Sequence, residues 1–486
     1  MFSADHPLTE KAPLLPIVCS LIAGIVIGHG LSVFGCLPSL GTSTLLLPLL
    51  IGFVALVSLT ILARRYPLLQ SLLIYCSMMA LGVLLCLRAK EQLSRTADSV
   101  ERAYEVIVAS EPAEKAKTMA VDVMLCKSGG KVTCYIWKDE DSRQLRPGDG
   151  LLLKTKIEPG FQVYSLRCYV SRWKWDYAAL SLRSLSLTDR TRIRFLIWRH
   201  RLLEKYRLLG AADDAFAVLA AMTLGDKSAL TKELKDTYSV SGASHVLALS
   251  GLHLSIIYLL LSGITFSRVR RRVWSQAVIV LSIWAFALLV GLPVSVVRSA
   301  LMISIFALFS LSERPHLSIN LLCLAALIIL LSSPLSLFDV GFQLSFMTVF
   351  SILVFTPLFT PVTSSRLLRP LYSCLAVSVA AQIGSAPLVA FYFGRFSTYF
   401  LLTNLVVIPA AYLLLFGTLL MLLLPPLAPV VVWLTHQLNS ILTAITKLPM
   451  ASLEGLRPSV VQVLLCYVFV ATLYAIYWLL KGRRRF

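Results

Sequence analysis

Polar residues interrupt a long apolar run between Ser241 and His253, where the sequence reads SGASHVLALSGLH. This stretch carries two Ser-Gly pairs and two histidines, His245 and His253. Glycine weakens helices and histidine is costly to place in lipid, so neither is expected in a plain membrane span. Irregular backbone at membrane depth survives where protein buries it or water lines it. The stretch is therefore predicted to line a cavity or pathway.

Two kinds of chemistry were weighed for these residues. A Ser-His dyad, built from Ser250 or Ser241 with His253 or His245, would suit an intramembrane hydrolase, because an activated serine needs a base within hydrogen-bond reach. No third orienting group lies near it in the sequence. Metal binding is less favoured, because no HExxH motif frames the histidines and the nearest Asp and Glu lie outside the run. We expect no catalytic residue, metal or cofactor, and keep the hydrolase as an alternative.

Other polar side chains lie inside the apolar runs that follow, namely Arg298, Asp339, Gln343, Gln382 and Asn404. Ionisable groups at this depth are normally paired or face an aqueous cavity. Arg298 and Asp339 could form such a pair, and a purely structural ion pair would equally explain a charge that faces other helices.

The composition requires a membrane scaffold around these groups. Of the 486 residues, 57% are hydrophobic and 14% charged, and the mean hydropathy is +0.79. Such a chain cannot fold as one soluble domain, so a polytopic α-helical membrane protein is predicted. The formal charge of +20 lies mostly in short loops and one soluble insert, which indicates orientation signals, anionic lipid or an anionic substrate.

Residues 1–88 are predicted to form an N-terminal anchor of three spans, over 14–31, 44–62 and 67–87. The first run has no A-x-A-like cleavage site, so it is interpreted as an anchor rather than a signal peptide. Arg64 and Arg65 fill the loop between the second and third spans and place that loop in the cytoplasm. The N-terminus is then cytoplasmic, and the third span leads outward.

Residues 100–185 have a different period, with short β-branched and aromatic segments separated by Gly, Pro or Asp. About five strands in this length favour a small extracytoplasmic barrel of the OB type, a fold that often binds oligonucleotides. Between residues 143 and 207 about fifteen Lys or Arg stand against about five Asp or Glu. A solvated surface beside anionic lipid is the alternative. The candidate DNA-binding residues are Lys154, Lys156, Arg167, Trp173 and Lys174.

Three cysteines fall within this insert, Cys126, Cys134 and Cys168. They could hold one disulfide if the insert is extracytoplasmic, but the sequence leaves their pairing open.

Residues 190–238 are predicted to form amphipathic helices. The first, over 190–209, has apolar residues on one face and cations on the other, as in a helix that lies on a membrane surface. The alternative is a soluble helix that packs back on the barrel. A later short helix is expected to be capped by Ser228 or Thr231.

Residues 239–486 are predicted to form the membrane core, with nine spans. The expected spans are 245–266, 274–292, 293–311, 317–332, 335–355, 371–393, 398–424, 428–448 and 460–480. Basic loops at 268–272, 313–314 and 366–369 and the tail at 481–485 then all fall in the cytoplasm. The total is about twelve spans with both termini inside and the barrel outside. The span 428–448 is interrupted by His436, Gln437 and Asn439, so a cavity-lining or re-entrant segment is the alternative there.

The central stretch, preceded by Leu224-Gly225-Asp226, resembles the signature of the ComEC-type competence proteins, a family of bacterial inner-membrane DNA-uptake channels. Four later motifs match the family in the same order, and the resemblance covers nearly the whole chain. These motifs are Val297-Arg298-Ser-Ala300, Asp339-Val-Gly-Phe-Gln-Leu-Ser-Phe346, Ala381-Gln-Ile-Gly-Ser-Ala-Pro387 and Thr403-Asn-Leu-Val-Val-Ile-Pro409.

The resemblance implies passage of single-stranded DNA from the periplasm to the cytoplasm, with the OB-like domain meeting the DNA first. It also implies a cytoplasmic helicase-like motor and an extracellular DNA receptor as partners, since the sequence has no GxxxxGK[ST] motif for an ATPase. The pathway residues that it favours are Gly225, Asp226, Ser241, Gly242, His245, Ser250, Gly251, His253, Arg298, Asp339, Gln343, Gln382 and Asn404.

One departure from the family is expected. Many relatives append a metallo-β-lactamase-like domain thought to degrade the other strand, and the metal motifs of such a domain are not found before Phe486. Nuclease activity is therefore not expected of this chain, and a separate nuclease could supply it. An ion-coupled small-solute transporter, with Arg298 and Asp339 as coupling residues, is the main alternative to the DNA channel.

Overall fold

The computed structural model describes eight stretches of the chain. They are residues 12–33, 42–96, 98–127, 129–159, 166–264, 272–310, 318–359 and 368–483. Of the basic segments expected in the cytoplasm, residues 268–271, 313–314, 366–367 and 484–485 lie outside the described residues.

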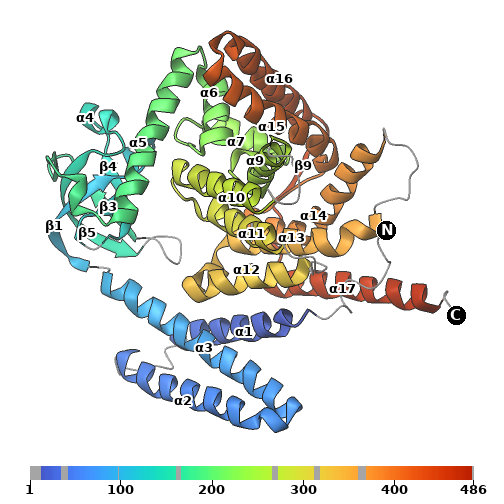
Figure 1. Cartoon of the computed structure of the whole chain (residues 1–486). Coiled ribbons are helices and arrows are strands. Elements are labelled where there is room, and N and C mark those ends of the chain that lie inside the picture. The colour runs from blue at the N-terminus through green and yellow to red at the C-terminus, as the bar shows by residue number, and fades with distance from the viewer. Residues whose placement is uncertain are drawn as a thin grey trace.

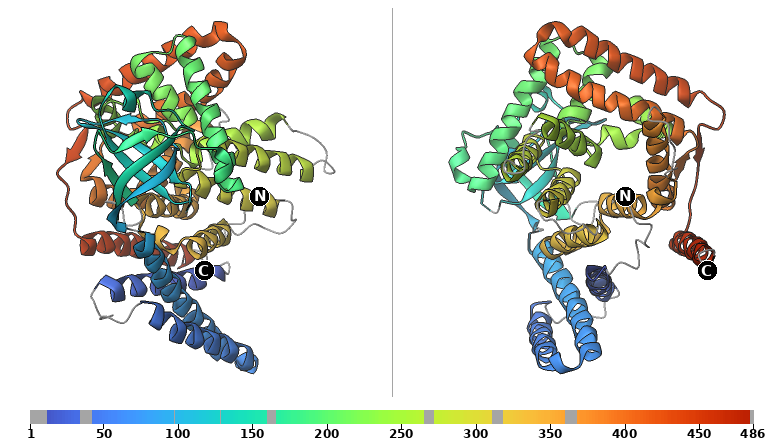
Figure 2. Two further views of the ribbon diagram at one scale, coloured as in Figure 1. Left: turned by 90° about the vertical axis from the view of Figure 1, so that its left-hand side faces the viewer. Right: turned by 45° about the vertical axis from the view of Figure 1, so that its right-hand side comes forward.

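Three helices form the N-terminal unit: α1 (Leu14–Val33), α2 (Thr42–Leu62) and α3 (Pro67–Thr96). α1 and α3 lie close together because Gly24 and Gly82 face the other helix's backbone, where any side chain would clash. The hairpin of α2 and α3 projects from the rest of the molecule (Figures 1 and 2). Its apolar side chains are exposed in the protein, as lipid-facing residues are expected to be.

A closed five-stranded β-barrel follows α3 directly (Figure 1). Its strands are β1 (Asp98–Val108), β3 (Thr118–Leu125), β4 (Lys131–Trp137), β5 (Gly150–Pro159) and β6 (Leu166–Val170). They follow the order β1-β3-β4-β6-β5, and the pairing of β5 with β1 closes the barrel. β4 and β6 run parallel and the other neighbours antiparallel. The predicted small barrel is thereby confirmed.

Smaller elements complete the barrel: β2 (Ala113–Glu114), the helix α4 (Glu140–Gln144) and β7 (Trp175–Tyr177). Side chains alternate along the strands as the period of two requires. On β5, Leu151, Leu153 and Ile157 fill the interior, while Lys154 and Lys156 point outward. This alternation gives the barrel an apolar core and a polar outer face.

Helix α5 (Leu187–Leu208) joins the barrel to the membrane core. Its buried Ile193 and Leu196 pack against the barrel, and Leu203 and Tyr206 pack into the core. The apolar face of α5 therefore packs against other parts of the protein. This agrees with the alternative that the helix packs on the barrel. Trp198 remains 61% exposed on the opposite side.

After α5 come α6 (Asp213–Leu219), a π-helical turn η3 (Ala220–Leu224) and α7 (Lys232–Val240). Thr231 caps α7, because its hydroxyl accepts a hydrogen bond from the Leu234 N–H at 3.1 Å. This is one of the two caps that the sequence indicated.

The core is built from the remaining helices. They are α8 (Ser244–Leu247), α9 (Gly251–Ile264), α10 (Arg272–Leu289), α11 (Val294–Ser310), α12 (Ser318–Ser332), α13 (Val340–Phe359), α14 (Arg369–Phe393), α15 (Phe400–Leu423), α16 (Ala428–Thr446) and α17 (Val460–Arg483). A 3₁₀ segment, η5 (Pro334–Phe338), precedes α13, and a two-stranded ribbon, β8 (Arg395–Ser397) with β9 (Ser452–Glu454), follows α14 and α16.

Among the described residues, eight helices are long and apolar enough to cross a membrane: α1, α2, α3, α13, α14, α15, α16 and α17. Helices α9 to α12 are apolar but shorter. The 14 residues of α9 span about 21 Å, less than a hydrocarbon core of about 30 Å. The chain is a membrane protein, but an exact count of twelve spans is not confirmed.

Helices α15 and α16 form an antiparallel hairpin that packs on α5, α6 and α7. The Lys205 ammonium group, near the end of α5, donates to the Leu422 carbonyl at 2.9 Å. Asn439 of α16 accepts a 2.8 Å hydrogen bond from the Tyr238 hydroxyl on α7. The tip of the hairpin therefore lies beside the helix that carries the barrel (Figure 1).

Candidate functional site

The first Ser-Gly pair of the central stretch forms the turn that ends α7. Gly242 has φ of +85°, and a side chain there would come within 2.9 Å of Ser397 on β8. Ser241 is fully buried, and its carbonyl accepts a 2.7 Å hydrogen bond from the Thr403 hydroxyl of α15. Both residues thus tie the turn to β8 and α15, where only glycine fits at position 242.

The second Ser-Gly pair starts α9. The Ser250 N–H donates to His253 Nδ1 at 3.3 Å, and the Ser250 hydroxyl lies 3.4 Å from the same nitrogen. A residue in the first turn that reaches back to the N-cap N–H is one half of a capping box. Gly251 faces Ser299 of α11, whose Oγ would lie 3.3 Å from an added Cβ. The predicted Ser-His contact exists, and it caps a helix.

The two histidines have opposite environments. The His253 ring is fully buried, and its Nε2 has no hydrogen-bond partner among the described residues. His245, on α8, is exposed, and its Nδ1 lies 3.2 Å from the Gly242 carbonyl. Of the two predicted pathway histidines, only His245 has an accessible side chain.

Arg298 and Asp339 form the ion pair that the sequence indicated. The Arg298 Nη1 lies 3.2 Å from Asp339 Oδ1. Oδ1 also accepts the Phe342 N–H at 2.8 Å, so Asp339 caps the start of α13. Gly341 leaves room for this pair, because a Cβ there would lie 3.0 Å from both charged groups. The Arg298 side chain is 5% exposed and that of Asp339 is 40% exposed.

A polar network extends from this pair to α14. Gln343 Nε2 donates to the Leu337 carbonyl at 3.0 Å, and its Oε1 accepts from the Tyr392 hydroxyl at 2.7 Å. Asn404 of α15 donates to the Ser378 hydroxyl of α14 at 3.2 Å. Gln382 is half-buried on α14. These contacts join α13 to α14 and α14 to α15.

Gly225 and Asp226 form a separate turn after η3. Gly225 has φ of +70°, and an added Cβ would meet Leu249 at 2.6 Å. Asp226 is buried, and its carboxylate accepts from the Ser228 N–H and hydroxyl at 3.3 and 2.7 Å. The Asp226 carboxylate thereby closes its own loop.

The five candidate DNA-binding residues share one region of the barrel. Lys154 and Lys156 point outward from β5, and Arg167 lies on the outer side of β6. Trp173 is 87% exposed, and the Lys174 carbonyl accepts the Lys154 N–H at 2.8 Å. A cationic surface with an exposed aromatic ring suits a nucleic-acid strand.

Two acidic residues, Glu101 and Glu158, lie among these cations, and the count of charges over residues 143–207 did not include Glu101. Glu101 on β1 forms a 2.6 Å ion pair with Lys174 and lies near Lys154 and Lys156. The hydrogen bond from Lys174 lowers the pKa of the Glu101 carboxyl, and the lysine charges add to this. Glu158 lies 3.8 Å from Arg167. The surface is therefore less positive than a count of Lys and Arg indicates.

Two tyrosines, Tyr135 and Tyr169, form an aromatic stack; Tyr169 is one of the aromatic residues that the sequence places among the cations of the barrel, but its pairing with Tyr135 was not predicted. Tyr135 on β4 and Tyr169 on β6 are paired in register, and their rings stack at 5.1 Å. Cys134 and Cys168 precede them and contact each other inside the barrel. The dipeptide Cys-Tyr occurs at both places, and this repeat was the available signal. Cys126 lies elsewhere, in the cluster between the barrel and α5.

The contact between the barrel and α5 contains a half-buried pair of titratable groups, Glu111 and His200. His200 Nδ1 lies 3.0 Å from Glu111 Oε1. Burial raises the pKa of the Glu111 carboxyl, Asp226 raises it further, and His200 and Arg199 act in the opposite direction. No group of three or more His, Cys, Asp or Glu that could hold a metal ion occurs among the described residues.

The chain is similar in sequence to a known protein family over the segment that contains the contacts of the core. The family model of the Competence proteins matches residues 222–481, more than half of the chain. The chain belongs to the Competence protein family. The matched segment contains the central stretch, the Arg298–Asp339 pair and the β8–β9 ribbon, whereas the barrel precedes it.

Three curated relatives are similar to part of the chain. ComE operon protein 3 of Bacillus subtilis is 29% identical over 254 residues, which cover 52% of this chain and 32% of that protein. Competence protein ComA of Neisseria gonorrhoeae is 30% identical over 31% of this chain and 23% of its own length. An uncharacterized protein of Aquifex aeolicus is 27% identical over 46% of this chain and 49% of its own. The matches thus span less than half of each relative. No solved structure matches the chain.

Proposed function

We propose that this chain is an inner-membrane channel for single-stranded DNA in natural transformation, with its barrel in contact with the incoming strand. The observation that carries the proposal is the Competence family match over the segment with the buried polar groups. The relatives named competence protein ComA and ComE operon protein 3 give the biological setting. The implied partners are single-stranded DNA, the bilayer, a cytoplasmic motor, an extracellular DNA receptor and a separate nuclease.

The barrel supports a DNA contact through its topology and its surface. Five strands closed in the order described, with one parallel pair, suit the OB type, which binds oligonucleotides. Lys154 and Lys156 lie on its outer face, near the Tyr135–Tyr169 stack on the neighbouring strands.

The expected orientation, with the barrel outside and both termini inside, is part of the proposal. Helix α3 has 30 residues, so Arg64 and Arg65 at its start lie about 45 Å along the helix from the barrel at its end. The end of α17 and the barrel also lie on opposite sides of the molecule (Figure 1). We propose further that α15 and α16 form a hairpin that remains on the outer side of the membrane instead of crossing it, because its tip lies beside α5, which joins the barrel to the core.

Cysteine labelling in intact cells, combined with an outer-membrane permeabiliser where needed, tests this topology. In a cysteine-free background, Pro425→Cys at the hairpin tip should react with a membrane-impermeant maleimide, like Lys131→Cys on the barrel. Arg64→Cys, at the far end of α3, should stay protected. Protection of Pro425→Cys would show that α15 crosses the membrane, as the twelve-span expectation has it.

Labelled-DNA import in a deletion strain tests the channel. His245→Ala should reduce import strongly while the protein stays in the membrane at normal amounts, because His245 is exposed and holds few contacts. His253→Gln is the matched control, since glutamine can still cap α9. Import by His245→Ala at the wild-type rate would remove the central stretch from the pathway.

The transporter alternative depends on Arg298 and Asp339 as ion-coupling residues. A structural role already explains both residues, because Asp339 caps α13 and also pairs with Arg298. DNA import that continues after collapse of the proton gradient, with no gradient-driven solute uptake, would exclude this alternative. A structural role also explains the Ser-His contact on which the hydrolase alternative depends, because Ser250 and His253 together cap α9.

A further inference from the structure

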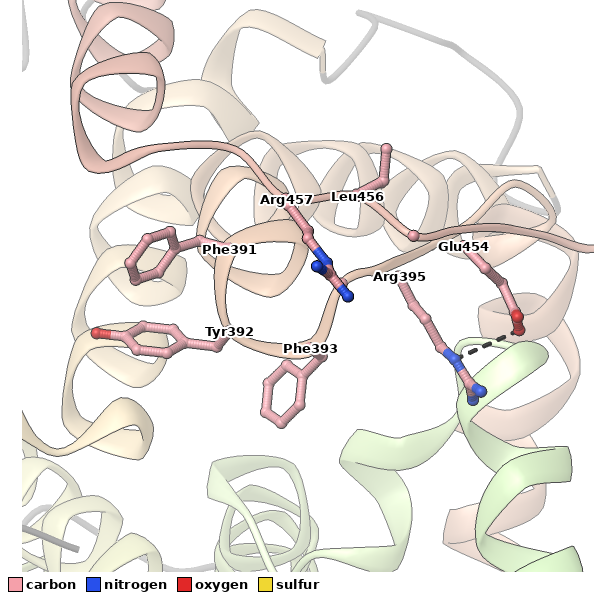
Figure 3. A pocket seen from close by; sticks show the side chains of 9 residues that line it. Phe391, Tyr392, Phe393, Arg395, Glu454, Leu456 and Arg457 are labelled. Carbon is pink, nitrogen blue, oxygen red and sulfur yellow. Dashed lines mark ion pairs between the residues drawn. The ribbon is translucent and has the colours of Figure 1, made fainter.

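A pocket of about 440 Å³ lies where α14 ends and the β8–β9 ribbon begins. Its volume is within the range of ligand sites, about 300–1,000 Å³. Three consecutive aromatic residues line one side, Phe391, Tyr392 and Phe393, and two arginines line the other, Arg395 and Arg457 (Figure 3). None of these five residues was singled out from the sequence.

The two arginines differ in their partners. Arg395 lies 3.3 Å from Asp236 of α7 and 3.3 Å from Glu454 of β9, so its charge is compensated. Arg457 is exposed, and none of the described carboxylates pairs with it. Figure 3 shows its guanidinium group reaching into the space between the aromatic rings and Arg395. One cation in the pocket is thus available to an anion.

Aromatic surface is available beside this cation. Phe393 is 60% exposed and is the last residue of α14, which ends at Gly394 with φ of +66°. The Tyr392 ring is held by its hydroxyl on Gln343 at 2.7 Å. An exposed ring next to a free guanidinium matches the two parts of a nucleotide, a base that stacks and a phosphate that accepts from arginine.

The pocket lies on the barrel side of the core, as a chain of contacts shows. Near the barrel end of α3, Lys90 donates to the His29 carbonyl at 3.3 Å. The His29 ring lies 4.3 Å from Phe338, the last residue of η5. One turn into α13, Gln343 accepts the hydrogen bond from Tyr392. The pocket and the attachment of the barrel are therefore joined at one end of the core.

We propose that this pocket binds one nucleotide of single-stranded DNA, with a base on Phe393 and a backbone phosphate on Arg457. The proposal rests on the DNA-channel function proposed above and assigns to the core a second contact with the strand, after the barrel. Arg395 holds the ribbon in place through Asp236 and Glu454 and is a positioning residue.

An anionic lipid headgroup offers the same phosphate but no flat ring. The pocket is lined by three consecutive aromatic residues and by the backbone of the ribbon. In this backbone, the Leu456 N–H donates a hydrogen bond to the Gly394 carbonyl at 3.0 Å. A stacking base uses the ring face, whereas a headgroup uses only the cation. The aromatic side of the pocket therefore favours a nucleotide.

Binding of a dye-labelled oligothymidylate to the full chain in neutral-lipid nanodiscs tests the proposal. Phe393→Leu should weaken binding by about tenfold, the loss expected for one stacked base. Arg457→Gln should weaken binding and reduce the slope of log K against log salt by about 0.7, as for one phosphate contact, while Arg457→Lys should keep the slope. Matched controls are Phe469→Leu, 63% exposed on α17, and Arg64→Gln.

The outcomes separate the pocket from the channel. Wild-type affinity and slope in both pocket variants, with binding by the parent protein, would overturn the pocket and leave the channel standing. A parent protein that binds no single strand would overturn both. Unchanged DNA binding together with loss of anionic lipid, seen by native mass spectrometry, would assign the pocket to a headgroup. A strand carrying 5-iodouracil should cross-link to a peptide with Phe393, and recovery of barrel peptides alone would contradict the proposal.

Discussion

The barrel and the central stretch of the core place polar side chains in opposite ways. On the barrel, the lysines of β5 point away from an apolar interior, and the strands form without them. In the core, the Thr403 hydroxyl donates to the Ser241 carbonyl, the His253 ring caps α9 and the Asp339 carboxylate caps α13. The barrel therefore does not depend on its outward-facing lysines to fold, whereas the core depends on its polar groups to join and cap its helices.

This difference determines how a variant in each region is to be interpreted. A barrel surface variant changes binding with little effect on folding, because surface substitutions usually cost less than about 0.5 kcal/mol. A core variant that removes a cap or an ion pair changes folding and transport together. Loss of import by a core variant is therefore informative only with a measure of folded protein.

The largest effect is expected inside the barrel, from Cys134 and Cys168. They face each other on adjacent parallel strands and would form a disulfide in an oxidising compartment. For a separation of 34 residues the bond would contribute about 3–4 kcal/mol in the chain-entropy model. Maleimide labelling of denatured protein should modify both cysteines only after reduction. Labelling without reductant would place the barrel in a reducing compartment and contradict the orientation.

In the core, loss of Arg298 is expected to have the next largest effect. Arg298→Gln leaves the Asp339 carboxylate without its cation, and breaking a buried pair costs about 3–5 kcal/mol. We expect roughly the lower value, because Asp339 is 40% exposed. The apparent melting temperature in detergent should fall clearly. Asp339→Asn, which can still cap α13, should lower it less than Asp339→Ala. Equal effects of these two variants would contradict the capping role.

The barrel could be predicted from the sequence because its signals are local. Alternation along β5 and turn residues such as Gly148 specify strands and their inward faces. The ion pair from Glu101 to Lys174 joins residues far apart in the sequence, so no local pattern reveals it. The register that stacks Tyr135 on Tyr169 likewise depends on barrel closure.

In the core, the hydropathy of the sequence locates the apolar helices. It does not show which of them cross the membrane or what they pack against. Apolar length shows that α15 is long enough to cross a membrane, but it does not show that the end of α15 contacts Lys205 of α5. For α5 the sequence shows an apolar face but not its partner, so it fits both a membrane surface and packing on the barrel. The pairing of Arg298 with Asp339 could be foreseen, since two opposite charges in apolar runs need each other.

A smaller effect is expected at the junction of the two regions, where Glu111 meets His200. Burial raises the pKa of Glu111 above its ordinary 4.5, so the folded state favours the neutral carboxyl. Its contribution to stability is complete below 4.5 and is lost as the pH rises through the raised value. Melting temperatures measured over this range should fall for the wild type and less for Glu111→Gln. Equal slopes would show that Glu111 does not couple the barrel to α5.

The smallest effect is expected on the barrel surface, from Glu101. Its carboxylate pairs with Lys174 and lies near Lys154 and Lys156, so it repels a phosphate that approaches these lysines. Glu101→Gln should therefore strengthen binding of single-stranded DNA by about two- to fivefold, the scale of one exposed ion pair, and steepen the salt dependence. Glu114→Gln, which frees Lys138 elsewhere on the barrel, is the matched control. Equal gains in both variants would show that the gain comes from the net charge of the barrel and not from this lysine cluster. If Glu101→Gln gave no gain, the lysine cluster would not be part of the DNA-binding surface, and the stacked tyrosines would remain as the candidate contact.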